Sequence, residues 1–487
     1  MILKILLPLV LLVVAGYLYV VNRIAFTFLL PVVAVTIVSV IYFHNNPVGH
    51  DRRFRIRSFL NWLPLGLTYA CLYMGRYNLT EAKKAFGDQL MPKEDFGTIF
   101  AAGAVLYGVS FIVNGPLTDR LGGKVTILIG AAGSAICNVV LGFYTYRVLS
   151  GEDVSLFWPF LCAYAANMYF QSFGAVSIVK VNAAWFHIRE RGVFGGIFGT
   201  LISLGIFLAF DLTKIILQLT RSAEGQLQIW WAFFVPAAVL LGWVVIDVIL
   251  LKDTPGQAGY DDFNTGDAGA DEADDKKLST FELYKTLLTH PVVLMMVAIE
   301  FCSGVLRNGI MHWGTIFSKD IGVAKTDVFF LNWGLILMVA GITGGFFAGI
   351  LSDKLFGSRR GPSAFFLYAG MFLGFLTMVF AVRLEWHFMV GFLSFFMSMC
   401  VIGVHGMLSG TASMDFGGKK AAATTAGVID GFVYLGTGVQ SLCLGHIIPS
   451  WGWNAWPLFL IPFTVIGIFF TRRIWNAFPD SRRRGVR

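Results

Sequence analysis

Two arginines lie inside apolar stretches of the chain, where a fixed positive charge needs a physical reason. Arg76 stands in YACLYMGRYNL (69–79), and Arg307 stands in CSGVLRNGIMHW (302–313). A charge at membrane depth costs about 3 kcal/mol or more, so such residues normally face a cavity or a partner. A guanidinium group presents a planar fork of donors that matches phosphate bidentately, and carboxylate offers a similar but poorer match. The two arginines therefore predict a buried anion site that binds phosphate.

The surroundings of each arginine differ. The polar stretch NLTEAKKAFGDQ follows Arg76 closely, so its side chain could instead reach the headgroup region. Arg307 is followed by the apolar GIMHWGTIF before Lys319, and it cannot reach an interface as easily. Tyr69 and Tyr73 precede Arg76 by seven and three residues and share its helix face. Their hydroxyls could orient the ligand, or their rings could pack against a neighbouring helix.

Further polar residues lie in apolar runs. Glu300 precedes Arg307 by seven residues, which is about 10 Å along a helix and nearly the same face, and Asp430 lies in AGVIDGFVYLG. These two acids could balance basic neighbours, or one of them could carry a proton during transport. Asn308 is the best additional ligand candidate, and His405 is either a ligand contact or a bundle histidine.

The elements that must position these residues are membrane helices. The chain has 487 residues, 56% hydrophobic and only 14% charged, with a mean hydropathy of +0.70, whereas soluble domains are about a quarter charged. Fourteen apolar segments reach or exceed the roughly 20 residues that a helix needs to cross a bilayer. This pattern predicts an all-α membrane protein. The segments cover residues 2–21, 24–43, 58–80, 97–117, 125–146, 156–180, 193–217, 228–251, 290–317, 327–352, 363–383, 386–413, 420–446 and 454–473.

The net charge of +8 indicates topology and not a nucleic-acid partner. Basic residues gather in alternate short loops, as expected for cytoplasmic loops of a bacterial inner-membrane protein. With fourteen spans, both termini are then cytoplasmic. Residues 1–45 are interpreted as a retained transmembrane hairpin, with a cleaved signal peptide as the alternative. This hairpin could pack at the periphery of the bundle or recruit another membrane protein.

The rest of the chain divides into two similar halves. Residues 46–251 and 290–475 each contain six apolar segments, residues 252–289 form a polar cytoplasmic linker, and residues 476–487 form a basic tail. GPLTDRLGGK (115–124) in the first half corresponds to GILSDKLFGSRRG (349–361) in the second. The two membrane arginines occupy matching places relative to these loops, so they should meet at the axis between the halves. Two six-helix halves around a central site resemble the major facilitator superfamily.

The chain also resembles the organophosphate:phosphate antiporter family over about residues 58–475. Matching stretches, in order, are YACLYMGRYN, LYGVSFIVNGPLTDR, FQSFGAVSIVKVNAAWFHIRERG, KDTPGQAG, GVLRNGIMHW, LSDKLFGSRRG and KKAAATTAGVIDGFVYLG. The resemblance implies that Arg76 and Arg307 clamp the substrate phosphate and that Tyr69 and Tyr73 line the same cavity. It implies alternating access, with inorganic phosphate exchanged for an organophosphate. Asp119, Arg120, Asp353 and Lys354 resemble the superfamily's cytoplasmic gating motif, although topogenic charge alone would also explain them.

Some positions depart from the family pattern. Phe111 stands where the family's transporters often have a lysine, and Ile202 stands where they often have a histidine. Ala175, Val176 and Ser177 replace a tryptophan and prolines. The predicted clamp is therefore retained while part of its polar surroundings is replaced.

Three functions remain open from the sequence. The first is a transporter that exchanges a sugar phosphate, glycerol phosphate or phosphoglycerate for phosphate. The second is a membrane sensor of sugar phosphate, and the third is a proton-coupled transporter of another organic anion. No phosphate loop, nucleophile elbow or zinc-binding helix motif is present in the sequence, so we expect no enzyme activity, metal or cofactor.

Overall fold

The computed structural model describes residues 2–187, 189–265, 285, 287–357 and 359–477. For residues 2–9, 11, 12, 191, 192, 353 and 410–426 it describes the backbone alone. Most of the predicted linker and of the basic tail (266–284, 286 and 478–487) therefore lies outside the described residues. Within them the chain forms helices and no strands.

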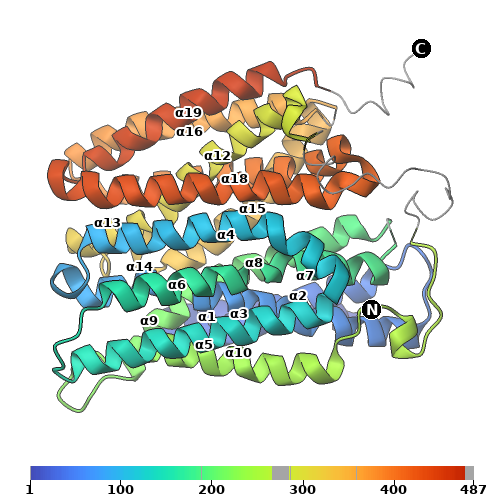
Figure 1. Cartoon of the computed structure of the whole chain (residues 1–487), viewed down its shortest axis with the longest axis horizontal. Helices are drawn as coiled ribbons and strands as arrows, with labels where there is room; N and C mark the ends of the chain where they lie inside the picture. Colours follow the sequence, from blue (N-terminus) through green and yellow to red (C-terminus); the bar gives the residue numbers. More distant parts are fainter. Residues whose placement is uncertain (1, 188, 266–284, 286, 358, 478–487) are drawn as a thin grey trace.

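The helices form two groups that follow one another in the sequence (Figure 1). An N-terminal hairpin consists of α1 (Ile2–Val21) and α2 (Arg23–His44). The first half contains α3 (Arg52–Leu90), α4 (Lys93–Leu121), α5 (Gly123–Leu149), α6 (Phe157–Gln171), α7 (Phe173–Trp185), α8 (Arg191–Phe207), η1 (Leu208–Leu212), α9 (Thr213–Leu219) and α10 (Trp231–Leu250). The second half contains α12 (Pro291–Met311), α13 (Trp313–Asp320), α14 (Val328–Leu331), α15 (Trp333–Ile350), η3 (Leu351–Leu355), α16 (Arg360–Arg383), α17 (His387–His405), η4 (Gly406–Ala412), α18 (Ser413–Trp451) and α19 (Ala455–Arg473).

Eleven of the described helical segments are long and apolar enough to cross a membrane. They include α2 but not α1, and they omit α3, whose 39 residues carry several charges, and the short helices α6 and α7. The predicted segment 156–180 is divided between α6 and α7 at Ser172. The all-helical fold is thus confirmed, and the count of fourteen spans stays a prediction.

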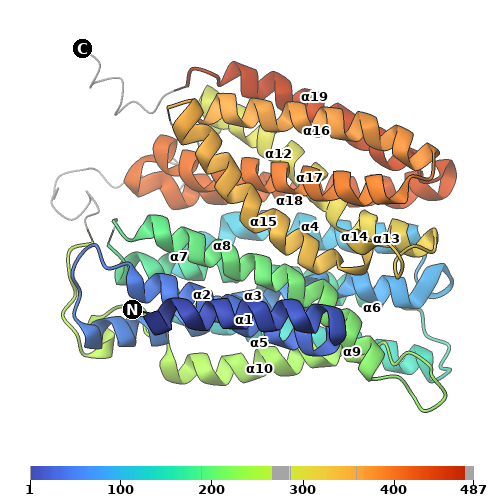
Figure 2. The ribbon, with the colours of Figure 1, turned by 180° about the vertical axis from the view of Figure 1, so that it is seen from behind.

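The two halves meet along α4 and α18, which lie side by side in Figures 1 and 2. Small residues permit this close contact. A Cβ atom on Gly97 would lie 2.5 Å from the carbonyl oxygen of Ser441, and one on Gly108 would lie 2.7 Å from that of Gly431. The helices therefore run antiparallel and approach almost backbone to backbone.

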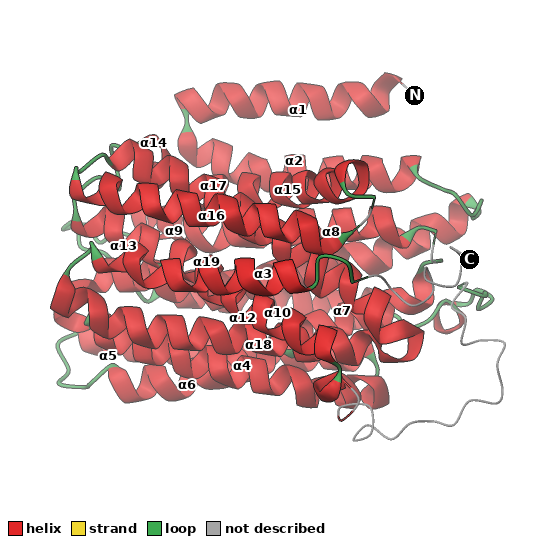
Figure 3. Cartoon of the chain, turned by 90° about the horizontal axis from the view of Figure 1, so that it is seen from above, coloured by secondary structure: helices red, strands yellow, loops and turns green. Residues whose placement is uncertain are grey.

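The N-terminal hairpin packs on the outside of the first half. Helix α2 contacts α8, and the hydroxyl of Tyr42 donates to the carbonyl oxygen of Arg55 on α3 at 3.0 Å. Helix α1 packs against α2 at the edge of the molecule (Figure 3), and its Val13 and Val20 are 72% and 80% exposed. The hairpin also reaches the second half, because Arg23 Nη1 donates to Asn332 Oδ1 at 2.7 Å. Helix α2 thus packs on the first half and contacts the second half at its first residue.

Polar contacts between the halves gather at one end of the bundle, which we call the far end. It is the end opposite to the first turn of α1 and the last turn of α19 (Figure 1). There Thr80 Oγ1 and His312 Nδ1 lie 2.7 Å apart, and Lys84 Nζ donates to Thr315 Oγ1 at 2.7 Å. Lys93 forms an ion pair with Asp320 at 2.8 Å.

A second group of contacts holds the start of α15 at the same end. The carboxylate of Asp211 in η1 accepts the backbone N–H groups of Gly334 at 3.2 Å and Leu335 at 2.9 Å. Lys214 Nζ donates to the carbonyl oxygen of Leu331 at 2.9 Å. Because these partners belong to opposite halves, the far end is closed by direct polar bonds.

Candidate functional site

The side chain of Arg76 is fully buried. Its Nε donates to Gln171 Oε1 at 3.1 Å, Nη1 donates to Tyr434 Oη at 3.2 Å, and Nη2 donates to Tyr107 Oη at 3.1 Å. These partners come from α6, α18 and α4. The guanidinium therefore points to the interface between the halves, and the alternative in which it reaches the headgroups is wrong for this structure.

The partners of Arg76 are themselves held in place. Gln171 Nε2 donates to the carbonyl oxygen of Leu72 at 2.8 Å and to Ser134 Oγ at 2.9 Å, so its Oε1 is turned toward Arg76. The hydroxyl of Tyr164 donates to the carbonyl oxygen of Arg76 at 3.1 Å. Such fixed hydrogen bonds orient the guanidinium before any ligand arrives.

Aromatic rings surround this guanidinium. Its central carbon lies 4.6 Å from the ring centre of Tyr73 and 4.5 Å from that of Tyr107, which is within the range of cation–π attraction. Tyr69 is buried, and its ring meets that of Tyr73 edge to face at 5.3 Å. A Cβ atom on Gly174 would lie 2.8 Å from the Tyr69 ring, so Tyr69 packs tightly against α7. Tyr73 thus contacts Arg76 directly, and Tyr69 supports Tyr73 from the side.

Arg307 approaches the same place from the second half. Its guanidinium carbon lies 5.9 Å from the ring centre of Tyr434, the residue whose hydroxyl accepts from Arg76. Among the described residues Arg307 Nε is buried without a hydrogen-bond partner, and no carboxylate lies within 4.0 Å of the side chain. Tyr434 therefore stands between two arginines from opposite halves, and one of them has donor capacity left for a ligand.

Two neighbouring positions shape the site around Tyr434. Phe111 stacks on the Tyr434 ring with 6.2 Å between centroids and an angle of 12°. Asn308 Nδ2 donates to Thr437 Oγ1 at 2.7 Å, so this amide joins α12 to α18. Its Oδ1 is buried and has no hydrogen-bond partner among the described residues. Asn308 is adjacent to the arginine, and its role as a ligand stays a prediction.

The two membrane acids both lie near Arg307. Glu300 is fully buried, and its Oε2 lies 2.9 Å from His405 Nδ1. Asp430 Oδ1 accepts from Ser409 Oγ at 2.5 Å, and Asp430 interacts electrostatically with His405, Glu300 and Arg307. His405 is thus the partner of a carboxylate, a pairing that spacing along the sequence does not indicate.

The predicted gating residues lie at the other end of the bundle. Asp119 forms an exposed ion pair with Lys180 of its own half at 2.8 Å, and Arg120 and Lys354 are exposed. The side chain of Asp353 lies outside the described residues. Their proposed role in gating is not tested by these contacts.

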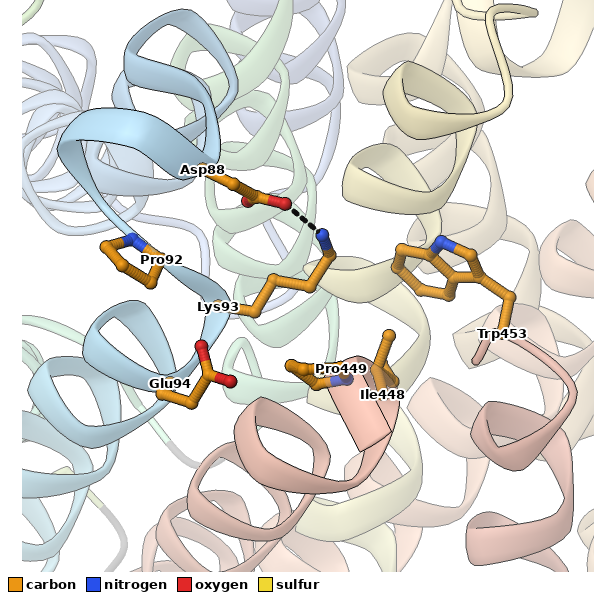
Figure 4. A pocket seen from close by; sticks show the side chains of 7 residues that line it. All are labelled: Asp88, Pro92, Lys93, Glu94, Ile448, Pro449 and Trp453. Carbon is orange, nitrogen blue, oxygen red and sulfur yellow. Dashed lines mark hydrogen bonds and ion pairs between the residues drawn. The ribbon is translucent and has the colours of Figure 1, made fainter. Parts of the chain in front are cut away.

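A pocket at the far end is lined by Asp88, Pro92, Lys93, Glu94, Ile448, Pro449 and Trp453 (Figure 4). It lies between the start of α4 and the end of α18, and neither membrane arginine lines it. Burial raises the pKa of Asp88, but hydrogen bonds from Lys83 and Lys93, each 2.5 Å long, outweigh burial and leave this pKa below its ordinary value. The pocket belongs to the closure of the far end and not to the anion site.

Three residues that contact Arg76 were not predicted as site residues from the sequence: Tyr434, Tyr107 and Gln171. Tyr434 follows Asp430 by four residues, so a helical wheel places both on one face of α18. That relation was visible in AGVIDGFVYLG. The direction in which this face points was not, because α18 is apolar around most of its circumference.

Comparison with known proteins finds a family profile and several relatives that match the chain. The Major Facilitator Superfamily profile matches residues 65–441. The glycerol-3-phosphate transporter of Bacillus subtilis (strain 168) is 26% identical over 445 residues, covering 88% of this chain and 93% of that protein. The membrane sensor protein UhpC of Escherichia coli (strain K12) is 26% identical over 421 residues, with 83% and 89% covered. A probable hexose phosphate transport protein of Chlamydia pneumoniae is 24% identical, with 88% and 93% covered.

Solved structures give the same fold. A bacterial homolog of the human lysosomal transporter Spinster, in an inward-facing and unoccupied conformation, aligns with a TM-score of 0.60 at 15% identity over 88% of this chain and 98% of its own. A point mutant of the nucleoside transporter NupG aligns with a TM-score of 0.59 at 13% identity over 87% of this chain and the whole of its own. At these identities the likeness concerns the fold alone. The resemblance to organophosphate transporters is confirmed by the three sequence relatives.

Proposed function

The chain belongs to the Major Facilitator Superfamily, and from that premise we propose that it carries a small organophosphate across a bacterial inner membrane in exchange for inorganic phosphate. The family and its relatives mark it as a multi-pass transport protein and not an enzyme. Sugar phosphates, glycerol phosphate and phosphoglycerate all satisfy the proposal, because each carries the phosphate that the site would hold.

The observation that carries this proposal is the meeting of Arg76 and Arg307 at Tyr434. The hydroxyl of Tyr434 accepts from Arg76, and its ring lies beside Arg307. A phosphate that displaced this hydroxyl would offer several charged acceptors to two guanidinium groups. Asn308, Tyr73 and Tyr69 lie on the same helices as the arginines and would complete the wall of the site.

The arrangement of contacts supports alternating access. Polar bonds between the halves close the far end, where Lys93 and Asp320 form one of the ion pairs. The basic loops at Asp119, Arg120 and Lys354 lie at the other end, which the charge pattern predicts to be cytoplasmic. In this proposal the structure is closed toward the outside, and the halves rock about the arginines to open it. Asp119, Arg120, Asp353 and Lys354 would then bear on the cytoplasmic closure.

The named relatives support the choice of substrate. Their names refer to glycerol 3-phosphate, to hexose phosphate and to a membrane sensor. The first two names support an organophosphate as the substrate. The third supports sensing of an organophosphate as the alternative function that the test can reveal.

Counterflow in liposomes tests the proposal. The purified protein is reconstituted with unlabelled phosphate inside, labelled phosphate is added outside, and sugar phosphates, glycerol phosphates and phosphoglycerates are tested as competitors. We expect exchange in the wild type and a loss of at least about tenfold in Arg76→Lys and in Arg307→Lys, since a point charge replaces a bidentate fork. Arg147→Lys is the matched control, because Arg147 forms a partly exposed ion pair with Glu152 on the surface.

Each outcome discriminates between the functions. Full exchange in either lysine variant would refute the arginine site. Competitor binding without exchange in the wild type would assign a sensor. If the wild type shows neither phosphate exchange nor competitor binding, an organophosphate substrate is ruled out.

A further inference from the structure

Glu300 is a buried carboxylate with one oxygen left for a ligand. It is fully buried in α12, and its Oε2 lies 2.9 Å from His405 Nδ1, while its Oε1 has no hydrogen-bond partner among the described residues. Buried carboxylate oxygens are normally hydrogen-bonded when the group serves only to hold helices together. Asp211 is such a case, since each of its oxygens accepts a backbone N–H group. The Oε1 of Glu300 therefore needs a donor that the described residues do not supply.

A second carboxylate lies near Glu300 on the neighbouring helix α18. Asp430 interacts electrostatically with Glu300, and its Oδ1 accepts from Ser409 Oγ at 2.5 Å. We call Glu300 and Asp430 the acid pair. Asp430, His405 and Arg307 are each partly exposed, whereas Glu300 is fully buried. A small molecule can therefore approach the group from the side of these three residues, with Glu300 at its inner end.

The charges around the predicted phosphate position do not balance once a phosphate is bound. Arg76 and Arg307 carry two positive charges, and the acid pair carries two negative charges. A phosphate monoester adds about two more negative charges at neutral pH. With His405 protonated as well, the described side chains of this group are still about one positive charge short. Because a buried charge without a counter-charge is costly, a ligand that brings its own positive charge is favoured.

A protonated primary amine meets both requirements. It carries a positive charge, and it donates hydrogen bonds that the unpartnered Oε1 can accept. A sugar hydroxyl would donate to the same oxygen without the charge, and a second anionic group would be repelled by the acid pair. Glu300 precedes Arg307 by seven residues, which is about 10 Å along the helix. A phosphate at the guanidinium and an amine at the carboxylate would therefore be the two ends of one small molecule.

We propose that the transported organophosphate carries a protonated primary amine, as an amino sugar phosphate does, and that Glu300 and Asp430 bind this amine while the two arginines bind the phosphate. Inorganic phosphate occupies only the arginine end and leaves the acid pair without a ligand. The inference rests on the proposed function, because it requires the phosphate to lie at Arg76 and Arg307. It also ranks the substrates that the proposed function allows. An amino sugar phosphate binds best, a neutral sugar phosphate binds less well, and phosphoglycerate, with its additional carboxylate, binds worst.

The matched control is a buried membrane acid in the first half. Asp247 on α10 is also fully buried; its Oδ2 accepts from Thr68 Oγ1 at 2.6 Å and its Oδ1 has no hydrogen-bond partner among the described residues. Neither membrane arginine is among its described electrostatic partners. Glu300→Gln and Asp247→Asn therefore remove equally buried carboxylates, and only the first removes a member of the acid pair.

The experiment is competition in the phosphate counterflow assay at about pH 6.5, where an amine is protonated. Glucosamine 6-phosphate and glucose 6-phosphate are the two competitors, because they differ only by an amine in place of a hydroxyl. The readout is the ratio of their half-inhibitory concentrations within each protein, which does not depend on the rate of exchange. Where a variant exchanges too slowly, the same ratio is read from displacement of bound labelled phosphate.

We expect the amine to improve inhibition in the wild type and in Asp247→Asn. Glucosamine 6-phosphate should act at roughly five- to tenfold lower concentration than glucose 6-phosphate, because a charge-assisted hydrogen bond is about twice as strong as a neutral one. N-acetylglucosamine 6-phosphate, whose nitrogen is a neutral amide, should lose this advantage. In Glu300→Gln the ratio should fall toward one.

Other outcomes would overturn the inference. Equal inhibition by the amine and the hydroxyl compound in the wild type would remove the amine and leave the proposed function intact. An unchanged ratio in Glu300→Gln would remove this site. If Glu300→Gln fails to fold, Asp430→Asn takes its place, because that side chain is partly exposed, and it should lower the ratio in the same direction. Stronger inhibition by 3-phosphoglycerate than by glucose 6-phosphate would also contradict the inference. Absence of both exchange and competitor binding in the wild type would instead refute the proposed function.

Discussion

Replacing the two arginines by lysine should separate their structural and binding roles. Arg76 makes three side-chain hydrogen bonds of 3.1 to 3.2 Å to partners on three helices. A lysine ammonium can retain about one of them, because the three acceptors lie around the flat edge of a guanidinium. Each lost bond is worth about 1 kcal/mol net, so Arg76→Lys should lower the free energy of unfolding by about 2 kcal/mol.

Arg307 gives the opposite expectation for stability. It makes no hydrogen bond to a described residue, and its Nε is left without a partner. Arg307→Lys keeps the charge and loses no hydrogen bond to a described residue, so it should lower the free energy of unfolding by less than about 1 kcal/mol. Both variants should weaken phosphate binding by about tenfold or more, since a point charge replaces a bidentate fork.

The assay combines two measurements on detergent-solubilised protein. Unfolding is followed without phosphate, and phosphate binding is measured by titration calorimetry, with Arg147→Lys as the control for handling. Equal destabilisation by both substitutions would refute the conclusion that hydrogen bonds to protein groups fix Arg76 but not Arg307. Unchanged phosphate affinity in Arg307→Lys would refute its role as ligand.

Other substitutions test neighbouring parts of the account. Tyr434→Phe removes the hydroxyl that accepts from Arg76 and that a phosphate would have to displace, so it should tighten phosphate binding by up to about tenfold; the exposed Tyr146→Phe is the control, and equal phosphate affinity in both variants would contradict the shared-tyrosine arrangement. Lys93→Met removes the ion pair to Asp320 and should open the far end more often. An impermeant maleimide should then label W453C in the far-end pocket several-fold faster than it does with Lys93 present. An unchanged labelling rate would argue against closure by this ion pair. Asp88→Asn should lower the unfolding free energy at pH 7 by an amount below about 1 kcal/mol, because its side chain is 54% exposed. The pKa of Asp88 lies below 3.8 in the folded protein, so its stabilisation is present above that pH and is lost as pH falls through the folded pKa. The difference between Asp88→Asn and wild type should therefore disappear below the folded pKa, and a difference that persists there would contradict the ion-pair explanation.

Much of the fold follows from hydropathy, because a helix that crosses a bilayer must bury about 20 apolar residues in a row. The predicted segment 125–146, for example, lies inside α5 (Gly123–Leu149). The ends of helices that carry charged residues were harder to predict. The predicted segment 58–80 is the middle of α3, which begins at Arg52 and continues to Leu90 past a break at Gly87, where φ is 69°. Polar residues at helix ends lower the local hydropathy without ending the helix.

The arginine pair was predictable for a physical reason, and its partners were not. A guanidinium in an apolar run is costly wherever it lies, so Arg76 and Arg307 are visible one at a time. Tyr434 is an ordinary aromatic residue of a membrane helix, and it lies 358 positions from Arg76. Its place between the arginines depends on the close approach of α4 and α18 at Gly108 and Gly431. Local spacing contains no information about that packing.

The same distinction applies to the acids. The sequence predicted that Glu300 shares a helix face with Arg307, and the structure shows Glu300 fully buried. The contact between Glu300 and His405 joins residues 105 positions apart and needs the packing of α17 on α12. Charges along one helix can be related by periodicity, whereas partners on different helices are set by tertiary packing.

Phosphate counterflow by Arg307→Lys, set against wild type and Arg147→Lys in the same liposomes, tests the central claim most directly. The claim is that an anion binds between two arginines from opposite halves. It predicts that wild type and Arg147→Lys exchange labelled phosphate at similar rates and that Arg307→Lys loses roughly nine-tenths of the exchange or more, about the tenfold expected when a bidentate contact is removed. Exchange by Arg307→Lys at the wild-type rate would contradict it.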